Sequence, residues 1–562
     1  MNLRQGFWAA LLVLAVTVLG AGRAGAGPGV SQEDLLQAQE KPDRWVHYGR
    51  NYGAWRYVPT DTINRENVAL LAPQWIHQTG VLGGGFEVTA LMFDEKLFIT
   101  TPNSHLICVN ARTGQTLWRY DHILPTVNLC CGPVNRGVAA HGNHVYWTTL
   151  DAHLMCFDAD TGLQLWDRTV ADYRESYALT SAPLIVKDLV ITGVAGGEYG
   201  IRGFIDAYHV DTGERVWRFN TVPGEGEPGN ETWEGDSWKT GGAPAWITGT
   251  YDPDQNVIFW GVGNPSPDFN GDVRKGDNLY SNAIVALNAD TGALQWHFQA
   301  TPHDIFDLDG ASEAMVIDEY INGIDTKAVV QVNRNGFLYA LNRTNGAFLY
   351  AKPYTKVTWA GFDENGKPYI KEEARKSGQY QVCPGIFGGK NWPPAAYSPK
   401  THLIYLPDME RCATYIQMEV VFRRGLPYYG GAMVLEDPED AEGYIKAVDV
   451  RTGEIQWTYQ TPGGPNWGGM LATGGGLVFG GSPDGYLRAF DDETGTVLWE
   501  YYTGSGIFAP PTSFVLDGQQ YIGIASGWGQ PAEIVGISQT LGGSAYILFS
   551  LPDIFPPKKV QP

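Results

Sequence analysis

Short segments in which apolar and polar residues alternate recur along the chain, for example at residues 336–341 and 485–490. A period of two is typical of β-strands, because successive side chains of a strand point to opposite faces. Most of these segments run into a turn of the form Asp/Asn-x-x-Thr-Gly, in which glycine supplies the positive φ of a tight hairpin. The pattern predicts an all-β chain made of many short hairpins.

A tryptophan follows each Thr-Gly turn after three residues, and we expect it to open the next strand and to pack between neighbouring sheets. Seven marks follow such turns, Trp118, Trp166, Trp217, Trp296, Tyr350 in a degenerate copy, Trp457 and Trp499, and an eighth, Trp75, is expected to mark the edge of an earlier copy. A repeat of roughly forty to fifty residues with four strands is typical of a β-propeller. The step from Tyr350 to Trp457 is about twice the usual one, so we expect a blade without the signature around residues 397–405, and an eight-bladed β-propeller in total.

We expect one propeller domain at 27–562, closed by N- and C-terminal strands that share a blade. Residues 223–240 are interpreted as an inserted loop. Loops inserted between blades are expected to cap one end of the central channel, and loops on a rigid scaffold are where function concentrates.

Residues 1–26 have the form of a secretory signal peptide. Arg4 is followed by an apolar run at 7–19 and by Ala-Gly-Ala at 24–26, which fits a cleavage site. The apolar run is short for a membrane span, and no later stretch resembles one. The sequence therefore predicts an exported protein, periplasmic in a bacterium.

Charge and cysteine content narrow the choice of partners and cofactors. The net charge of −22, from 61 acidic and 39 basic residues, argues against nucleic acid or an anionic membrane as partner. The six cysteines include no C-x-x-C-H motif, so no covalently bound haem is expected. Cys108 and Cys156 occupy matching places in two repeats and are expected to be buried. The adjacent Cys130 and Cys131 could bond to each other or to other cysteines.

Residues 301–310 hold three carboxylates and a histidine. Asp307 and Asp309 are two residues apart, which in an extended segment places both side chains on one face. Two carboxylates on one face suit a hard cation, and one of them could act as a base on a substrate beside the metal. The alternative is a solvated acidic turn closed by Gly310.

Together these motifs resemble the quinoprotein alcohol dehydrogenases, periplasmic enzymes that use pyrroloquinoline quinone (PQQ). The resemblance covers essentially the whole chain after the signal peptide. It implies a Cys130–Cys131 disulfide ring against one face of the quinone, Trp246 on the other face and Arg136 at a cofactor carboxylate. Two family hydroxyls are missing here: a serine is Ala195, and a threonine is Ala243 or Pro244.

The resemblance also implies a metal site formed by Glu198, Asn264 and Asp307, with Asp307 taking the alcohol proton as hydride moves to the quinone. Calcium members of the family usually carry a small or neutral residue where this chain has Asp309, and lanthanide members carry a second aspartate. Three carboxylates offset a trivalent ion better than Ca²⁺, because unbalanced like charges repel and favour protonation of one group. We therefore expect a lanthanide, with Ca²⁺ as the alternative.

Further positions match cofactor contacts or a second, structural disulfide of the family. The cofactor positions are Glu87, Thr149, Ala195, Gly196, Gly197, Arg334, Asn391, Trp392, Trp467 and Trp528, and the disulfide is Cys383–Cys412.

The resemblance implies oxidation of a primary alcohol to an aldehyde, a separate soluble cytochrome c as electron acceptor, and a homodimer. Residues 264–277 look more like the broad alcohol and ethanol branch than the methanol branch, and Phe306 is expected near the pocket. The rival from another class is a non-catalytic propeller that binds proteins. It shares the repeat but gives no reason for Cys130–Cys131, Glu198, Asn264 and Asp307 to occur together.

Overall fold

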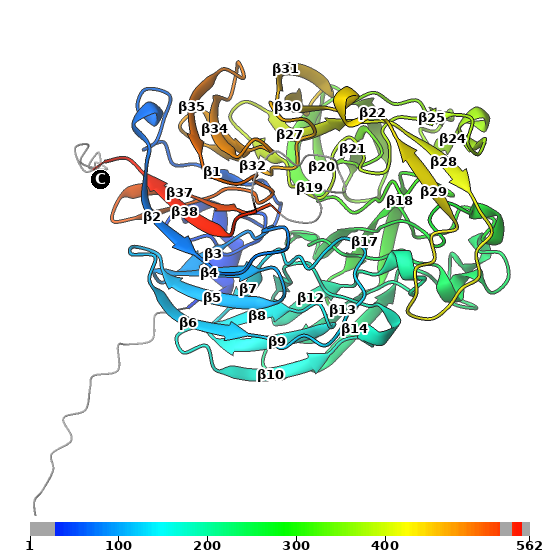
Figure 1. Ribbon diagram of the computed structural model, residues 1–562, viewed down its shortest axis with the longest axis horizontal. Helices are drawn as coiled ribbons and strands as arrows, with labels where there is room; N and C mark the ends of the chain where they lie inside the picture. Colours follow the sequence, from blue (N-terminus) through cyan, green and yellow to red (C-terminus); the bar gives the residue numbers. More distant parts are fainter. Residues whose placement is uncertain (1–28, 529–541, 553–562) are drawn as a thin grey trace, which may run out of the picture.

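Each tryptophan repeat folds into one sheet of the computed structural model, which describes residues 29–528 and 542–552. Within these ranges, eight sheets of four or five strands contain most of the strands. Figure 1 shows them following one another in chain order around a common centre. The predicted signal peptide, residues 1–26, lies outside the described residues.

The strands of each sheet are consecutive or nearly so in the chain. The first four sheets are β3 (Leu91–Phe93), β4 (Lys96–Thr101), β5 (His105–Asn110) and β6 (Thr116–Asp121); β7 (Val138–His141), β8 (His144–Thr148), β9 (His153–Asp158) and β10 (Gln164–Thr169); β11 (Leu184–Val186), β12 (Leu189–Gly193), β13 (Phe204–His209) and β14 (Arg215–Asn220); and β15 (Thr250–Asp252), β16 (Val257–Gly261), β17 (Ala283–Asn288) and β18 (Leu294–Gln299). The next three are β19 (Met315–Ile321), β20 (Ile324–Val332), β21 (Phe337–Asn342) and β22 (Phe348–Pro353); β26 (Ala396–Ser398), β27 (Leu403–Glu410), β30 (Glu442–Asp449) and β31 (Glu454–Gln460); and β1 (Tyr57–Val58), β32 (Met470–Thr473), β33 (Leu477–Gly481), β34 (Tyr486–Asp491) and β35 (Val497–Tyr502). The last is β36 (Thr512–Leu516), β37 (Gln519–Ser526), β38 (Ala545–Ser550) and β2 (Ala72–Gln78).

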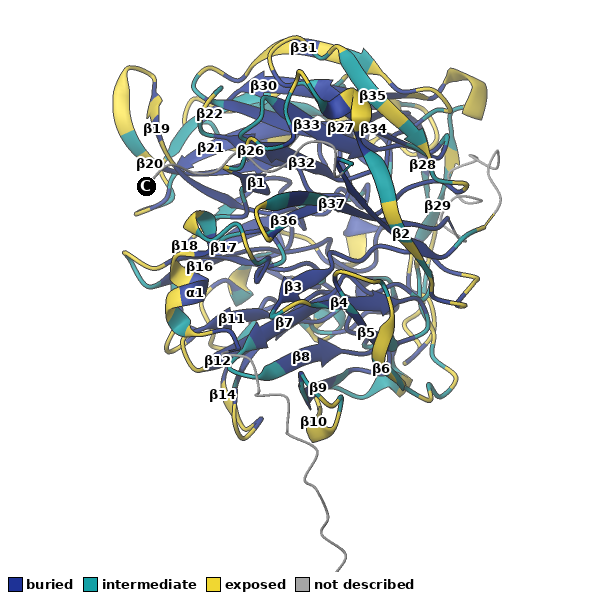
Figure 2. Ribbon diagram, turned by 90° about the vertical axis from the view of Figure 1, so that its left-hand side faces the viewer, coloured by how far each residue is buried: buried dark blue, intermediate teal, exposed yellow. Residues whose placement is uncertain are grey.

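The last sheet joins the two ends of the described chain. Strand β2 pairs antiparallel with β38, with Gln78 opposite Ala545 and Ala72 opposite Ser550. The expectation that N- and C-terminal strands share a sheet is confirmed. Figure 2 shows buried inner strands and partly exposed outer strands, such as β6 and β10.

The outer strands of seven of the eight larger sheets carry a repeat tryptophan that bonds to the next sheet, and β22 carries Tyr350 instead. The Trp217 indole Nε1 donates to the carbonyl of Ala289 at 3.0 Å. At Gly292 of the same turn, φ is +69° and an added Cβ would lie 2.6 Å from the Trp217 ring. Equivalent Nε1 bonds join Trp118 to Ala159, Trp166 to Val210, Trp296 to Arg343, Trp457 to Asp492, Trp499 to Leu71 and Trp75 to Ala111. The predicted packing of tryptophan between sheets is therefore confirmed.

One sheet was predicted wrongly. Residues 397–405 do not form a separate blade, because they belong to β26 and β27, whose sheet ends in β31 with Trp457. The extra length between Tyr350 and Trp457 instead forms two small sheets, one of β23 (Ala360–Phe362) and β24 (Pro368–Ile370), the other of β25 (Gln381–Val382), β28 (Ala413–Gln417) and β29 (Gly431–Leu435). The eight marks correspond to the outer strands of the eight larger sheets, since Trp75 marks a full sheet completed by the C-terminal strands.

Helical structure within the described ranges is short. It comprises α1 (Gln32–Leu36) and the 3₁₀ turns η1 (Ala38–Glu40), η2 (Val68–Leu70), η3 (Tyr173–Glu175), η4 (Gly197–Tyr199), η5 (Asn230–Thr232), η6 (Ser237–Thr240), η7 (Gly271–Val273), η8 (Glu372–Arg375) and η9 (Pro438–Asp440). No helix among these residues has the length and apolar character needed to cross a membrane.

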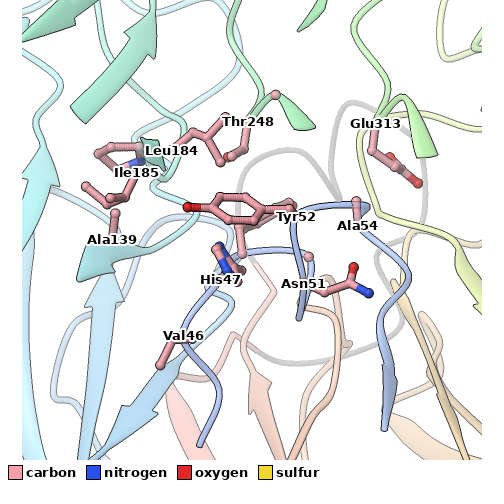
Figure 3. Close-up of a pocket in the computed structure, with 14 residues that line it drawn as sticks. Val46, His47, Asn51, Tyr52, Ala54, Ala139, Leu184, Ile185, Thr248 and Glu313 are labelled. Carbon is pink, nitrogen blue, oxygen red and sulfur yellow. The ribbon is translucent and has the colours of Figure 1, made fainter. Parts of the chain in front are cut away.

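The segment 45–58 crosses the inner edges of the sheets and is largely buried. Its backbone exchanges hydrogen bonds with Met92 of β3, Tyr251 of β15, Val316 of β19, Tyr397 of β26 and Ala472 of β32. Figure 3 shows Tyr52 and His47 from this segment facing Leu184 and Ile185 of β11 across a cavity of about 20 Å³. The segment thus ties together the first strands of sheets that are distant in the chain.

Gly292→Ala tests the contact between tryptophan and turn. The new methyl group would clash with the Trp217 ring and the residue would keep a positive φ, so we expect the unfolding free energy to fall by about 2–4 kcal/mol. The measurement is the thermal unfolding midpoint by circular dichroism.

The matched control is Gly226→Ala, where φ is +81° but no atom lies within 4 Å of the added Cβ. This variant carries the backbone cost alone, about 1 kcal/mol. Equal losses in the two variants would contradict a packing role for the Thr-Gly glycine.

Candidate functional site

A cavity of about 540 Å³ is lined by loops from several sheets and by Gly431, Ala432 and Met433 of β29. Most of the residues selected from the sequence line it, although they are spread over nearly four hundred positions of the chain. These are Glu87, Cys130, Cys131, Arg136, Ala195, Gly196, Glu198, Trp246, Asp307, Asp309, Arg334, Asn391, Trp392 and Trp467.

Three selected residues lie directly behind this wall. The backbone N–H of Asn264 donates to Asp309 Oδ1 at 2.7 Å, and a Cβ at Gly197 would lie 3.1 Å from Asn264 Oδ1. Trp528 packs on Phe508, with ring centroids 4.0 Å apart, in an apolar cluster that includes Trp392 and Trp467.

Thr149 is the one selected residue that the structure places elsewhere. Its hydroxyl donates to Asp151 Oδ1 at 2.6 Å, and it is not among the described residues lining the cavity. The threonine on the wall is Thr180, whose hydroxyl donates to the carbonyl of Trp246 at 3.2 Å. The expected position of Thr149 beside the cofactor is therefore not matched by the cavity, whose wall carries Thr180 instead.

The wall around Cys130, Cys131 and Trp246 combines flat surfaces with a buried ion pair. Cys130 and Cys131 are bonded to each other, and their sulfur atoms lie within 4.8 Å of the Glu198 carboxylate. The Arg136 guanidinium carbon lies 5.0 Å from the Trp246 ring centroid, and its Nη2 is 2.8 Å from Glu87 Oε2. Burial raises the pKa of Glu87 to about 7, against the opposing effect of Arg136.

Next to this surface the cavity holds four carboxylates, the buried Asp268, Asp307 and Asp309 and the half-buried Glu198. Burial raises the pKa of each, to about 7 for Glu198, and the neighbouring carboxylates add to this effect for Glu198, Asp268 and Asp307. Arg334 opposes it, with Nη1 2.5 Å from Asp309 Oδ2 and Nη2 3.6 Å from Asp307 Oδ2. A metal ion is the usual way to stabilise so many buried acids in their charged form.

The loop that presents Asp307 is built around Asp304. The carboxylate of Asp304 accepts hydrogen bonds from the backbone N–H groups of Phe306 at 2.9 Å and Leu308 at 2.8 Å. Asp307 itself has φ +58°, a conformation that costs energy for a non-glycine residue and is concentrated at functional sites. The 301–310 segment is therefore a buried, tightly bonded loop, and the alternative of a solvated acidic turn is wrong.

The donor set fits a hard cation. Asn264 Oδ1 and Asp307 Oδ1 are buried and accept no hydrogen bond from any residue the structure describes. Glycine at 197 and 263 leaves room beside them, since a Cβ at Gly263 would lie 2.4 Å from Asp309 Oδ1. Carboxylate and amide oxygens are the ligands that Ca²⁺ and similar hard ions prefer. Glu198, Asn264, Asp307 and Asp309 could hold such an ion.

The remaining wall fits a planar, anionic cofactor. Trp246 and the Cys130–Cys131 ring offer flat surfaces, and Arg136 and Asn391 offer hydrogen-bond donors at the edge. Pro244, rather than Ala243, lines the cavity beside Ala195, so the two missing hydroxyls fall on this wall. Thr180, another residue of this wall, carries a hydroxyl group.

Several wall residues were not found from the sequence. Asp268 follows Asn264 by four positions, a spacing that could have been noticed. Phe269, Ile386, Phe387, Tyr429 and Met433 form an apolar surface, and nothing in their local sequence points to a pocket. Phe306, expected near the pocket, does not line it but belongs to the apolar cluster that includes the wall residues Phe269 and Met433.

The hairpin of β28 and β29 is joined to the part of the cavity that holds the carboxylates. The N–H of Tyr428 donates to the carbonyl of Glu198 at 2.7 Å, and the N–H of Phe269 donates to the carbonyl of Tyr429 at 2.8 Å. The Cys383–Cys412 disulfide, predicted as structural, is present at the base of this insertion. Cys108 and Cys156 are free and buried, as expected.

Comparison with known proteins agrees with this geometry. Residues 45–360 and 460–522 match the family model described as glucose/ethanol/alcohol dehydrogenase, beta-propeller domain, under the heading PQQ. The chain is 40% identical over 556 residues to quinoprotein alcohol dehydrogenase PedH of Pseudomonas putida, covering 94% of this chain and 92% of that protein. It is 35% identical to the lanthanide-dependent methanol dehydrogenase of Methylacidiphilum fumariolicum, covering 89% and 87%.

A solved structure described as a europium-containing methanol dehydrogenase superposes with a TM-score of 0.87 at 32% identity, covering 92% of this chain and all of that one. With the family model covering more than half of the chain and full-length relatives above 30% identity, the chain belongs to the PQQ-dependent quinoprotein alcohol dehydrogenases.

Proposed function

We propose that this protein oxidises primary alcohols to aldehydes with PQQ and one metal ion, with Asp307 as the base. The observation that carries the proposal is the position of the buried carboxylate cluster beside the wall formed by Cys130–Cys131, Arg136 and Trp246. A cation site and a flat cofactor site in one cavity are what this chemistry needs.

When bound, PQQ supplies a two-electron acceptor and the metal ion supplies a Lewis acid. Asp307 has one oxygen near Arg334 and one, Oδ1, without a described donor. That oxygen is free to accept the hydroxyl proton of an alcohol. The apolar surface of Phe269, Phe387 and Met433 can hold the carbon chain of the substrate and exclude water.

We infer that the metal is a lanthanide, with Ca²⁺ as the alternative. Four ionised carboxylates and the Arg334 guanidinium leave three net negative charges at the site. A trivalent ion would balance them, whereas a divalent ion would leave one buried charge uncompensated, which is costly in a low-dielectric interior. The lanthanide-dependent and europium-containing relatives favour the same choice.

Membership of this family supports further proposals about export, location, oligomeric state and the electron acceptor. We propose export by the signal peptide 1–26, one eight-bladed propeller domain at 27–562, a periplasmic location and a homodimer. A separate soluble cytochrome c would accept the electrons. The net charge of −22 would favour a carrier with a basic docking surface.

Reconstitution with single metals tests the metal assignment. Metal-free protein loaded with PQQ should reduce an artificial dye with ethanol after addition of La³⁺, and Ca²⁺ should restore little activity. Asp309→Ala should lower the La³⁺-dependent rate by at least about 100-fold, because it removes a ligand and a charge.

The control for this experiment is Asp325→Ala, which removes an exposed carboxylate on β20 and should leave the rate unchanged. Activity with Ca²⁺ but not with La³⁺ would keep the dehydrogenase and reject the lanthanide.

Asp307→Asn tests the base. The amide can still offer an oxygen to the metal but cannot take a proton, so we expect kcat to fall by about 10²–10⁴-fold. PQQ retention, measured by its absorbance, should be unchanged. A rate within tenfold of wild type would assign proton abstraction to another group.

A further inference from the structure

Asp268 is a buried carboxylate at the metal end of the cavity that does not belong to the four ligands inferred above. Its side chain is 1% exposed and lines the cavity. Asn264 Nδ2 donates a hydrogen bond to Asp268 Oδ1 at 3.1 Å. The two residues are linked by a short loop, Pro265 to Pro267, so this bond closes a tight local ring.

The bond decides which end of the Asn264 amide faces the metal. A primary amide has a donor end and an acceptor end of nearly equal size. With the NH₂ group held by Asp268, Asn264 Oδ1 points beside Gly197, where it is buried and has no described donor. A rotated amide would present NH₂ to the cation and repel it.

The negative charge of the Asp268 carboxylate is not neutralised by an ion pair with a neighbouring cation. Arg274, whose charge opposes the rise in the pKa of Asp268, is fully buried and donates to the Asn278 side chain and to the carbonyls of Pro267, Asp268 and Asp304. No lysine or arginine of residues 29–528 forms an ion pair with the Asp268 carboxylate in the structure. Its field therefore acts on the shared cavity with those of Glu198 and Asp309.

We propose that Asp268 is a positioning residue for the metal, which holds the Asn264 amide oxygen toward the ion and adds a fourth negative charge that favours a trivalent over a divalent cation. The inference rests on the proposed function, since it assigns a role at the same metal site. It has two separable parts, orientation and charge, which two substitutions distinguish.

Asp268→Asn keeps an acceptor oxygen for Asn264 Nδ2 but removes the charge, and Asp268→Ala removes both. The protein would be loaded with PQQ and titrated with Tb³⁺, whose luminescence is excited through neighbouring indoles such as Trp246. Ca²⁺ affinity would be measured by competition with Tb³⁺. Asp272→Asn, an exposed carboxylate of the same segment, is the matched control.

For Asp268→Asn we expect the Tb³⁺ Kd to rise at least tenfold and the Ca²⁺ Kd to rise less, because the lost Coulomb energy scales with the charge of the ion. For Asp268→Ala we expect both Kd values to rise further, since a misoriented supporting group typically costs 10–100-fold in affinity. The control should stay within twofold of wild type, and all variants should show wild-type circular dichroism.

Tb³⁺ and Ca²⁺ Kd values within twofold of wild type in both Asp268 variants would overturn this inference and leave the proposed function standing. Equal losses for the two ions in Asp268→Asn would overturn the charge role. A wild-type protein that retains PQQ but binds neither ion would overturn the proposed metal site and this inference together.

Discussion

The contact between a tryptophan ring and the Thr-Gly turn of the next sheet is the interaction on which the rest of this structure depends. In six of these contacts the indole N–H bonds to a turn carbonyl and the ring lies on a glycine with positive φ, and Trp499 makes the hydrogen bond alone. Because Trp499 bonds to Leu71 and Trp75 to Ala111, the series closes on itself. The first and last parts of the chain are then held in one sheet, and every inner loop faces a shared centre.

That closure makes a buried site with excess negative charge possible. Isolated ionised carboxylates are too costly to bury, so the scaffold must fix their positions before an ion arrives. Glu313 shows how this is done, since it accepts from the N–H of Ala395 and pairs with Lys390, a buried residue beside Asn391. Glu313 follows Asp309 by four positions. The Glu313–Lys390 ion pair therefore joins the loop at 301–310 to the loop that carries Asn391 and Trp392. The segment 45–58 adds a second brace across the inner strands.

The cofactor wall differs from the family pattern where hydroxyl groups are expected. Ala195 and Pro244 line it without a side-chain donor, and Thr180 is a hydroxyl bearer that remains. Arg136, with Glu87 as its ion-pair partner, is a charged donor on this wall.

The sequence by itself determined the repeat, the all-β class and most of the wall residues, because these depend on local turns and on short motifs that keep their spacing. It placed the Cys130–Cys131 pair, Glu198, Asp307 and Asp309 in one cavity, and Asn264 lies behind the wall, bonded to Asp309. It erred for the blade at 397–405 and for Thr149, and it missed Asp268 and the role of segment 45–58. Only the tertiary structure could decide these, because an insertion can lengthen a repeat without adding a sheet, and because burial and contacts between distant loops are set by ring closure rather than by neighbours in the chain.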